Sequence, residues 1–309
     1  MNVFAWHVHG SWMTAFVQGR WRTHVPVLPD RSAFGRGRAR TWTWPDAAVE
    51  VAPEEARHLD VDVLVLQRPE ELELAARWLG RRPGIDVPAL YVEHNAPQGA
   101  VNEMRHPVAN RPELVLVHVT HFNRLFWDAG STRTVVIEHG IVDPGRLYTG
   151  ELPRCGVVVN EPLRRARVTG TDLLPRFAKQ APVDLFGMET EPLGGVALPQ
   201  AELHAELARR RLYLHPFRWT SLGLSLLEAM QLGMPVVALA TTEVVEAVPP
   251  AAGLVTNRLD ALEAAVARLL REPDEARALG REARRCARER YGLERFLADW
   301  ERLFAEVVA

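Results

Sequence analysis

Apolar runs of strand length recur along the first half of the chain, and segments with helical spacing lie between several of them. Pro69 precedes a helical pattern over residues 70–79, and Thr120, a good N-cap residue, precedes another over 121–129. Strands that alternate with helices predict a parallel sheet covered on both faces, so we expect an α/β domain here. The expected strands are residues 2–8, 61–66, 89–92, 114–119 and 134–137.

Residues 139–153 interrupt this periodicity with two prolines and three glycines, and we place an interdomain linker there. The same alternation resumes after the linker and predicts a second α/β domain. Leucines and a valine fall at helical spacing in residues 259–270, and residues 274–309 form two helical patterns that separate near Tyr291. The strands expected in this half are residues 156–159, 183–186, 212–214, 236–240 and 253–255.

The composition is typical of a globular protein with a large core, since 47% of the 309 residues are hydrophobic and 25% are charged. A formal net charge of −2 favours neither nucleic acid nor a membrane surface as a partner, so a peripheral membrane contact would need a local patch. No apolar stretch approaches the ~20 residues of a membrane span. Cys155 and Cys286 are far apart and lack metal-ligand spacing, which predicts free thiols in a cytoplasmic protein.

The most informative segment spans residues 215–237 and reads HPFRWTSLGLSLLEAMQLGMPVV. A strand leads into a loop, Gly223 turns the loop into a helix, Gly233 ends that helix, and Pro235 begins an apolar strand. A helix N-terminus at the carboxyl edge of a parallel sheet favours phosphate, because its N–H groups and dipole attract anions. An ordinary βαβ unit would explain the glycines but not Glu228 on an otherwise apolar helix.

This segment resembles the signature of the retaining glycosyltransferases of family 4, which have the GT-B fold. Residues 253–255 and 260–273 resemble the strand and helix that follow the signature in that family. The matching signature residues are Gly223, Leu224, Leu226, Leu227, Glu228, Ala229, Met230, Gly233, Pro235, Val236 and Val237.

The resemblance implies two Rossmann-like open parallel-sheet domains that face a central cleft. It places an acceptor-side domain at residues 1–145, a nucleotide-sugar-binding domain at 154–290, and a final helix at 291–309 that packs back on the first domain. The implied reaction transfers a sugar from a nucleotide diphosphate sugar to an acceptor hydroxyl with retention, and it needs neither a metal nor a cofactor. The acceptor, whether a glycan, a lipid or a small molecule, stays open.

Two positions depart from the family pattern. Thr220 stands where the family has a Glu near the donor sugar, although a hydroxyl can still hydrogen-bond a sugar. Arg164 matches a diphosphate-binding Arg, but Thr169 replaces the Lys that follows it, and Arg167 is the candidate substitute. These departures support an alternative, namely a non-catalytic nucleotide-sugar or carbohydrate-binding homologue. The arginines could also belong to a solvated basic loop.

In the first domain, Gly10 and Ser11 follow the first expected strand, where the family has a loop near the donor phosphates. His94 ends another strand and resembles the family's first-domain His, although a histidine there can be purely structural. The pairs His7/His9 and His118/His121 lack the partners of a metal site. Residues 20–40 are rich in Arg, with tryptophans nearby, and they either line the acceptor side or form a mobile basic loop whose tryptophans merely pack on the domain.

The sequence therefore gives two sets of candidate residues. The catalytic candidates are His94, Arg164 and Thr220. The donor-binding candidates are Gly10, Ser11, Arg164, Arg167, Thr220, Ser221, Leu222, Gly223, Leu224 and Glu228.

Overall fold

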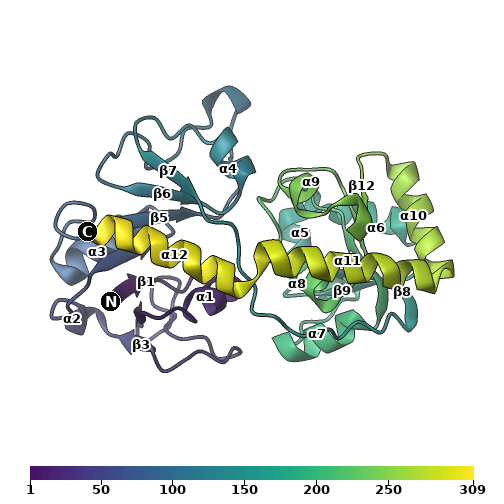
Figure 1. Cartoon of the computed structure of the whole chain (residues 1–309), viewed down its shortest axis with the longest axis horizontal. Helices are drawn as coiled ribbons and strands as arrows, with labels where there is room; N and C mark the ends of the chain where they lie inside the picture. The colour runs from purple at the N-terminus through teal and green to yellow at the C-terminus, as the bar shows by residue number, and fades with distance from the viewer. The chain divides into compact units, whose positions relative to one another are not determined.

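The computed structural model describes all 309 residues, which divide into two compact units (Figure 1). Unit 1 comprises Met1–Val142 together with Leu293–Ala309, and unit 2 comprises Asp143–Gly292. Each unit is built on one parallel sheet, as the alternation of strands and helices predicts.

The sheet of unit 1 has seven parallel strands in the order β3-β2-β1-β4-β5-β6-β7. The strand order reverses between β1 and β4, and open sheets of this kind bind ligands beyond the carboxyl ends of the strands at such a point. The strands are β1 Asn2–Ala5, β2 Arg22–Pro26, β3 Ala48–Val51, β4 Val63–Leu66, β5 Ala89–Glu93, β6 Val115–His118 and β7 Arg133–Val136. The helices are α1 Gly10–Phe16, α2 Pro53–Ala56, α3 Glu70–Leu79, α4 His121–Phe126 and α12 Leu293–Val308.

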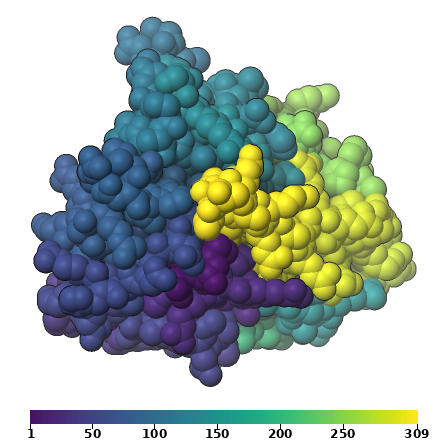
Figure 2. All heavy atoms as spheres, turned by 60° about the vertical axis from the view of Figure 1, so that its left-hand side comes forward, coloured from purple at the N-terminus to yellow at the C-terminus, as the bar shows by residue number.

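An aromatic cluster joins the two ends of the chain inside unit 1, where α12 lies against α1. The ring of Trp12 meets that of Trp300 at 5.9 Å, and Phe304 contacts both Phe16 and Trp21 edge to face. Figure 2 shows N-terminal atoms in purple beside C-terminal atoms in yellow. Buried aromatic pairs of this kind add to the stabilisation from apolar burial, so α12 is part of this core.

Strands β2 and β3 are absent from the sequence prediction, which left residues 20–40 as acceptor lining or a basic loop. The structure corrects this, because the segment opens with β2, a largely buried strand beside β1. Trp21 is only 2% exposed, and Trp44 donates its indole N–H to Thr14 Oγ1 at 2.9 Å. These two tryptophans pack in the core, as the second interpretation expected, and only its basic loop is corrected, to a strand.

The sheet of unit 2 has five parallel strands in the order β12-β11-β10-β8-β9. The strands are β8 Leu152–Val158, β9 Val183–Phe186, β10 Arg210–His215, β11 Val236–Ala238 and β12 Gly253–Val255. The α-helices are α5 Pro162–Arg165, α6 Leu174–Phe177, α7 Gln200–Ala208, α8 Leu224–Leu232, α9 Val244–Ala247, α10 Leu259–Arg271 and α11 Pro273–Tyr291. Short 3₁₀ turns include η2 Ala166–Thr169 and η3 Thr171–Leu173.

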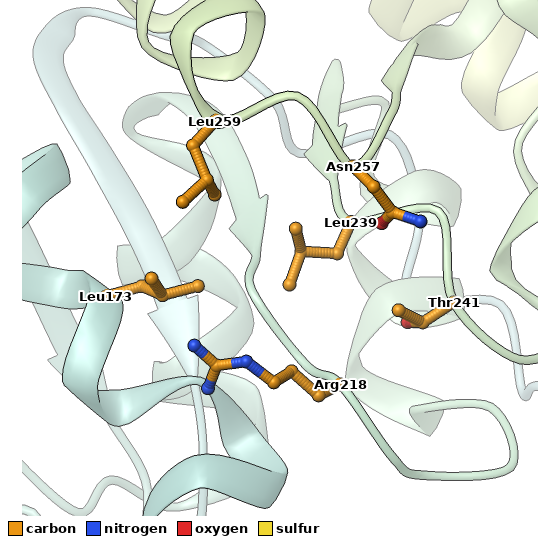
Figure 3. A pocket seen from close by; sticks show the side chains of 6 residues that line it. All are labelled: Leu173, Arg218, Leu239, Thr241, Asn257 and Leu259. Atoms are coloured by element: carbon orange, nitrogen blue, oxygen red, sulfur yellow. The ribbon is translucent and has the colours of Figure 1, made fainter.

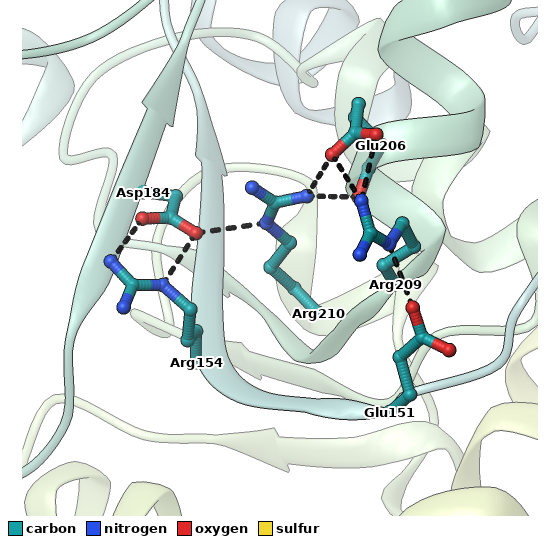
Figure 4. A network of polar contacts seen from close by, with 6 residues as sticks. All are labelled: Glu151, Arg154, Asp184, Glu206, Arg209 and Arg210. Carbon is teal, nitrogen blue, oxygen red and sulfur yellow. Dashed lines mark hydrogen bonds and ion pairs between the residues drawn. The ribbon is translucent and has the colours of Figure 1, made fainter.

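An ionic network ties together the starts of β8, β9 and β10, at the amino edge of this sheet (Figure 4). Asp184 accepts from Arg154 Nε at 2.7 Å and Nη2 at 2.6 Å, and from Arg210 Nε at 2.9 Å. Burial by itself would raise the pKa of Asp184, but the hydrogen bonds from the two arginines outweigh it and lower that pKa.

Replacing Asp184 with Asn is expected to destabilise the protein by about 1–3 kcal/mol at pH 7, because two arginines lose a charged acceptor. A lowered carboxyl pKa contributes stability above the ordinary value of about 3.9, and this contribution is lost as the pH falls through the folded-state pKa. Denaturant unfolding of both proteins at pH 7 and near pH 3 measures this. If the stability difference between the unchanged protein and Asp184→Asn were larger near pH 3 than at pH 7, the lowered pKa of Asp184 would be contradicted.

Candidate functional site

The start of α8 presents an open helix N-terminus at the carboxyl edge of the unit 2 sheet. Its N-cap is Gly223, with φ −69° and ψ 121°, and no side chain caps the helix. The first backbone N–H groups of a helix have no partner within that helix, and the first turn here contains no acidic residue to compete with an anion. The predicted turn residues lie here, with Ser221 and Leu222 buried and Thr220 half-buried. This geometry is suited to a phosphate group.

A fully buried histidine packs against the turn at Gly223. His215 ends β10, and its ring stacks on Phe217 with centroids 4.3 Å apart. Neither of its ring nitrogens has a hydrogen-bond partner, and burial lowers its pKa to about 3, so the ring is neutral. A Cβ at Gly223 would lie 2.9 Å from His215 Cε1, so the close approach requires glycine. His215 is not among the predicted site residues, although it immediately precedes the signature loop.

The loop after β10 is joined to the η2 turn that follows β8 and α5. The backbone N–H groups of Arg218 and Trp219 both donate to Val168 O, at 2.8 and 3.2 Å. Gly170 has φ +70°, and a Cβ there would lie 1.9 Å from Pro216 O. The two loops that carry the predicted donor residues therefore form one packed unit.

Three arginines near this junction have different environments. Arg164 and Arg167 are exposed, and they pair with Glu161 and Asp172 respectively. Arg165, which the sequence analysis did not select, is half-buried with its guanidinium 5.9 Å from the centre of the Phe217 ring. Burial lowers the pKa of Arg165, and repulsion by its neighbour Arg164 adds to that effect. The nearby charge of Glu161, which pairs with Arg164, offsets this lowering of the Arg165 pKa only in part, so Arg165 is suited to pair with an anion.

Glu228 lies on α8 with only 6% of its surface exposed. Its Oε2 accepts from Gln200 Nε2 at 2.9 Å and lies 3.3 Å from His204 Nε2. Both partners lie on α7, and the sequence analysis identified neither of them. A buried carboxylate requires such partners, and a ligand hydroxyl would have to join or replace them.

A cavity of about 320 Å³ lies at the carboxyl ends of β10, β11 and β12 (Figure 3). Its polar groups already have partners within the protein, since Arg218 pairs with Asp172, Thr241 donates to Phe217 O, and Asn257 donates to Ala240 O. None of the predicted site residues lines it. The lining residues are Leu173, Arg218, Leu239, Thr241, Asn257 and Leu259.

In unit 1 the predicted residues gather at the carboxyl edge of the sheet. Gly10 and Ser11 begin α1, and the preceding His9 has its ring 4.3 Å from that of His94, which follows β5. His139, after β7, stacks 6.3 Å from His94 on another side. Burial is the main cause that lowers the pKa of His9 to about 4, that of His139 to about 3, and that of His94 well below its usual value.

Neutral imidazoles at this edge can both donate hydrogen bonds to hydroxyl groups and accept hydrogen bonds from them.

No group of three or more His, Cys, Asp or Glu side chains has an arrangement that could hold a metal ion. Cys155 and Cys286 are both free. None of the helices combines the length and apolar character that a membrane span requires.

The segment that contains the α8 site also carries the family assignment. Residues 193–286 match the family model described as glycosyl transferases group 1. This segment of the chain is therefore similar to the group 1 glycosyl transferases. Among curated proteins, none matches the chain.

Solved structures share the fold of this chain at low identity. Sucrose-phosphate synthase from Thermosynechococcus elongatus has a TM-score of 0.72 and 14% identity over 99% of this chain and 98% of its own. HepE from Anabaena, in complex with UDP-glucose, has a TM-score of 0.71 and 15% identity over 99% and 100%. TarM from S. aureus has a TM-score of 0.63 and 15% identity. This match covers 78% of the present chain and 55% of the TarM chain. The predicted GT-B fold is confirmed.

Proposed function

We propose that this protein moves a sugar from a nucleotide diphosphate donor to an acceptor hydroxyl, with retention at the anomeric carbon. The observation that carries the proposal is the uncapped start of α8 at Gly223, where backbone N–H groups face the carboxyl edge of the sheet. HepE and TarM have been solved with UDP or UDP-glucose, so UDP-sugars are the first donors to test here.

The chemistry proposed for this site is electrostatic. Negative charge grows on the diphosphate as it leaves, and fixed N–H dipoles with a nearby guanidinium stabilise that charge without reorganising. The N–H groups come from the first turn of α8, and the guanidinium from Arg165, with Arg164 and Arg167 as secondary candidates. Glu228 would accept the ribose hydroxyls, and Thr220 would hydrogen-bond the donor sugar.

The first domain contributes the acceptor side in this proposal. Gly10 and Ser11 would approach the donor phosphates, and His94 would contact the transferred sugar. A glycan, a lipid or a small molecule can each supply the acceptor hydroxyl. The two free thiols support a reducing compartment such as the cytoplasm.

A non-catalytic nucleotide-sugar-binding protein is the second candidate, and Thr220 and Thr169 favour it because they replace charged family residues. Incubation with UDP-glucose and other nucleotide sugars, followed by quantification of released nucleotide, separates the two. Slow donor hydrolysis supports the transferase, whereas saturable binding without any turnover, with and without a range of acceptors, would contradict it.

Arg165→Ala is expected to weaken UDP binding about 10- to 150-fold, because a charge-assisted bond contributes about 1.5–3 kcal/mol. Arg164→Ala and Arg167→Ala should also weaken binding, but less, since both side chains are exposed and already paired. Calorimetric titration of the three variants with UDP measures their Kd values and so the order of the three losses. Unchanged affinity in all three would remove the diphosphate assignment from this loop.

A further inference from the structure

Three neighbouring strand ends in unit 1 carry a line of hydrogen bonds. Trp6 follows β1, Gln67 follows β4 and His94 follows β5, and these three strands are adjacent in the sheet. Gln67 Nε2 donates to Trp6 O at 2.7 Å, and Gln67 Oε1 lies 3.0 Å from His94 Nε2. The line therefore runs from a backbone carbonyl, through one buried amide, to an imidazole.

Each end of this line allows only one direction of donation. The carbonyl of Trp6 can only accept, so the amide of Gln67 must turn its NH₂ toward it. The opposite amide orientation would place two oxygens against each other at 2.7 Å. Gln67 Oε1 is then left facing the imidazole, and it too can only accept. His94 must therefore donate from Nε2, and in a neutral ring its Nδ1 carries a lone pair.

The amide itself has little freedom to rotate or withdraw. The Gln67 side chain is buried, and its backbone N–H donates to Glu71 Oε2 at 2.6 Å. The Trp12 ring meets His94 edge to face with centroids 5.0 Å apart, which holds the imidazole in its plane. Gln67 and Trp12 therefore fix the orientation of the His94 ring before any ligand binds.

The surroundings keep this imidazole uncharged. Burial lowers the pKa of His94, and the neighbouring His9 and His139 rings lower it further. These two histidines are themselves neutral at pH 7, since their pKa values are lowered as well. The charged groups around the cluster are Arg36 and Arg68 beside His9 and Arg295 beside His139. Glu71, at the backbone of Gln67, is titratable near neutral pH, because burial raises its pKa to about 7.

We infer that Gln67 is a positioning residue that fixes His94 as the Nε2–H tautomer, so that Nδ1 accepts a hydrogen bond from a hydroxyl of the bound sugar. The identity of the hydroxyl partner rests on the proposed function, whereas the tautomer does not. The geometry favours a neutral sugar hydroxyl over a carboxylate at this position, because a carboxylate has no hydrogen to donate.

Nitrogen NMR of ¹⁵N-histidine-labelled protein tests the tautomer directly, with the His94 signals assigned by their loss in His94→Asn. The expected spectrum between pH 5.5 and 8 has a protonated Nε2 and an unprotonated Nδ1, without averaging between the two. A protonated Nδ1, or averaged shifts from exchanging tautomers, would overturn the inference. This measurement needs no substrate, so it can succeed even if glycosyl transfer is the wrong reaction.

Two variants test whether Gln67 is responsible. Gln67→Met keeps the length of the side chain but removes the acceptor, and it is expected to give averaged tautomer shifts for His94. Gln67→Glu supplies a buried carboxyl group that can donate its proton to Trp6 O and accept from Nε2–H, so this variant is expected to keep the original tautomer. If His94 keeps a single tautomer in the Met variant, or loses it in the Glu variant, Gln67 has no such role.

The activity readout distinguishes positioning from general stability. Gln67→Met should lower kcat/KM for the donor about 2- to 13-fold, which corresponds to one hydrogen bond of about 0.5–1.5 kcal/mol. Gln67→Glu restores an acceptor for Nε2–H and should keep kcat/KM close to that of the unchanged protein. Equal losses in both variants would indicate a merely structural residue.

Discussion

Glu228→Gln is expected to lower affinity for nucleoside diphosphates roughly 10- to 150-fold, a loss as large as that expected for Arg165→Ala. A carboxylate accepts two hydroxyl protons side by side, which matches the vicinal hydroxyls of a ribose, whereas Gln offers one oxygen and one NH₂. Losing or weakening charge-assisted bonds of about 1.5–3 kcal/mol gives this range. Calorimetric titration with UDP measures it.

The stability of the same variant separates a binding role from a structural one. Gln at position 228 can still accept from Gln200, so the melting temperature of the ligand-free protein should change little. Glu228→Ala, by contrast, removes the carboxylate that accepts from Gln200, whose Nε2 then keeps only its contact with His204 Nε2 at 2.7 Å, and it should cost about 1–3 kcal/mol. If Glu228→Gln unfolds while its folded fraction binds UDP normally, the residue is structural.

Asp184→Asn provides a matched control for this experiment. It removes one carboxylate charge from the same unit, but at the amino edge of the sheet, in the network with Arg154 and Arg210. We expect this variant to lose stability and to keep its affinity for UDP. The opposite behaviour of the two substitutions would place nucleotide recognition at the carboxyl edge and exclude a general effect of charge removal.

Much of the fold follows from the sequence because local pattern and tertiary structure agree there. Strands β9 and β12 and helix α3 have the predicted bounds to the residue, and each is a short segment with clear flanking signals. Strands β2 and β3 were missed because β2 contains Arg22, His24 and Pro26, residues that rarely indicate a strand. Their place in the sheet comes from pairing with neighbouring strands, β1 beside β2 and β2 beside β3, which the local pattern does not report.

The candidate site was predictable where it is continuous in sequence. Gly223 and Glu228 stand in one signature, so a single segment identified both of them. Arg165, Gln200 and His215 matter through contacts with other loops, and no local pattern reports those contacts. Which of the two adjacent arginines in the one-turn helix α5 faces Phe217 depends on rotation about the helix axis, which the packing of that loop sets.

Gly170→Ala is expected to reduce both stability and donor binding, because it strains the junction between the two donor-site loops. The backbone at Gly170 is left-handed with φ +70°, which costs an alanine about 1–2 kcal/mol. The added Cβ would also overlap Pro216 O at 1.9 Å, and overpacking of this kind costs about 1–3 kcal/mol more. Each kcal/mol should lower Tm by roughly 2–4 °C in a unit of this size.

Gly194→Ala is the matched control, because Gly194 has nearly the same backbone conformation, φ +77°, but nothing within 4 Å of the added Cβ. It should show only the strain cost and retain UDP affinity. The difference in Tm between the two variants therefore isolates the contact with Pro216, and the difference in Kd isolates its effect on the loop that leads into α8. Equal losses of Tm and of UDP affinity in both variants would mean that Gly170 is needed only for its backbone conformation. The two loops would then not bind the donor as one unit.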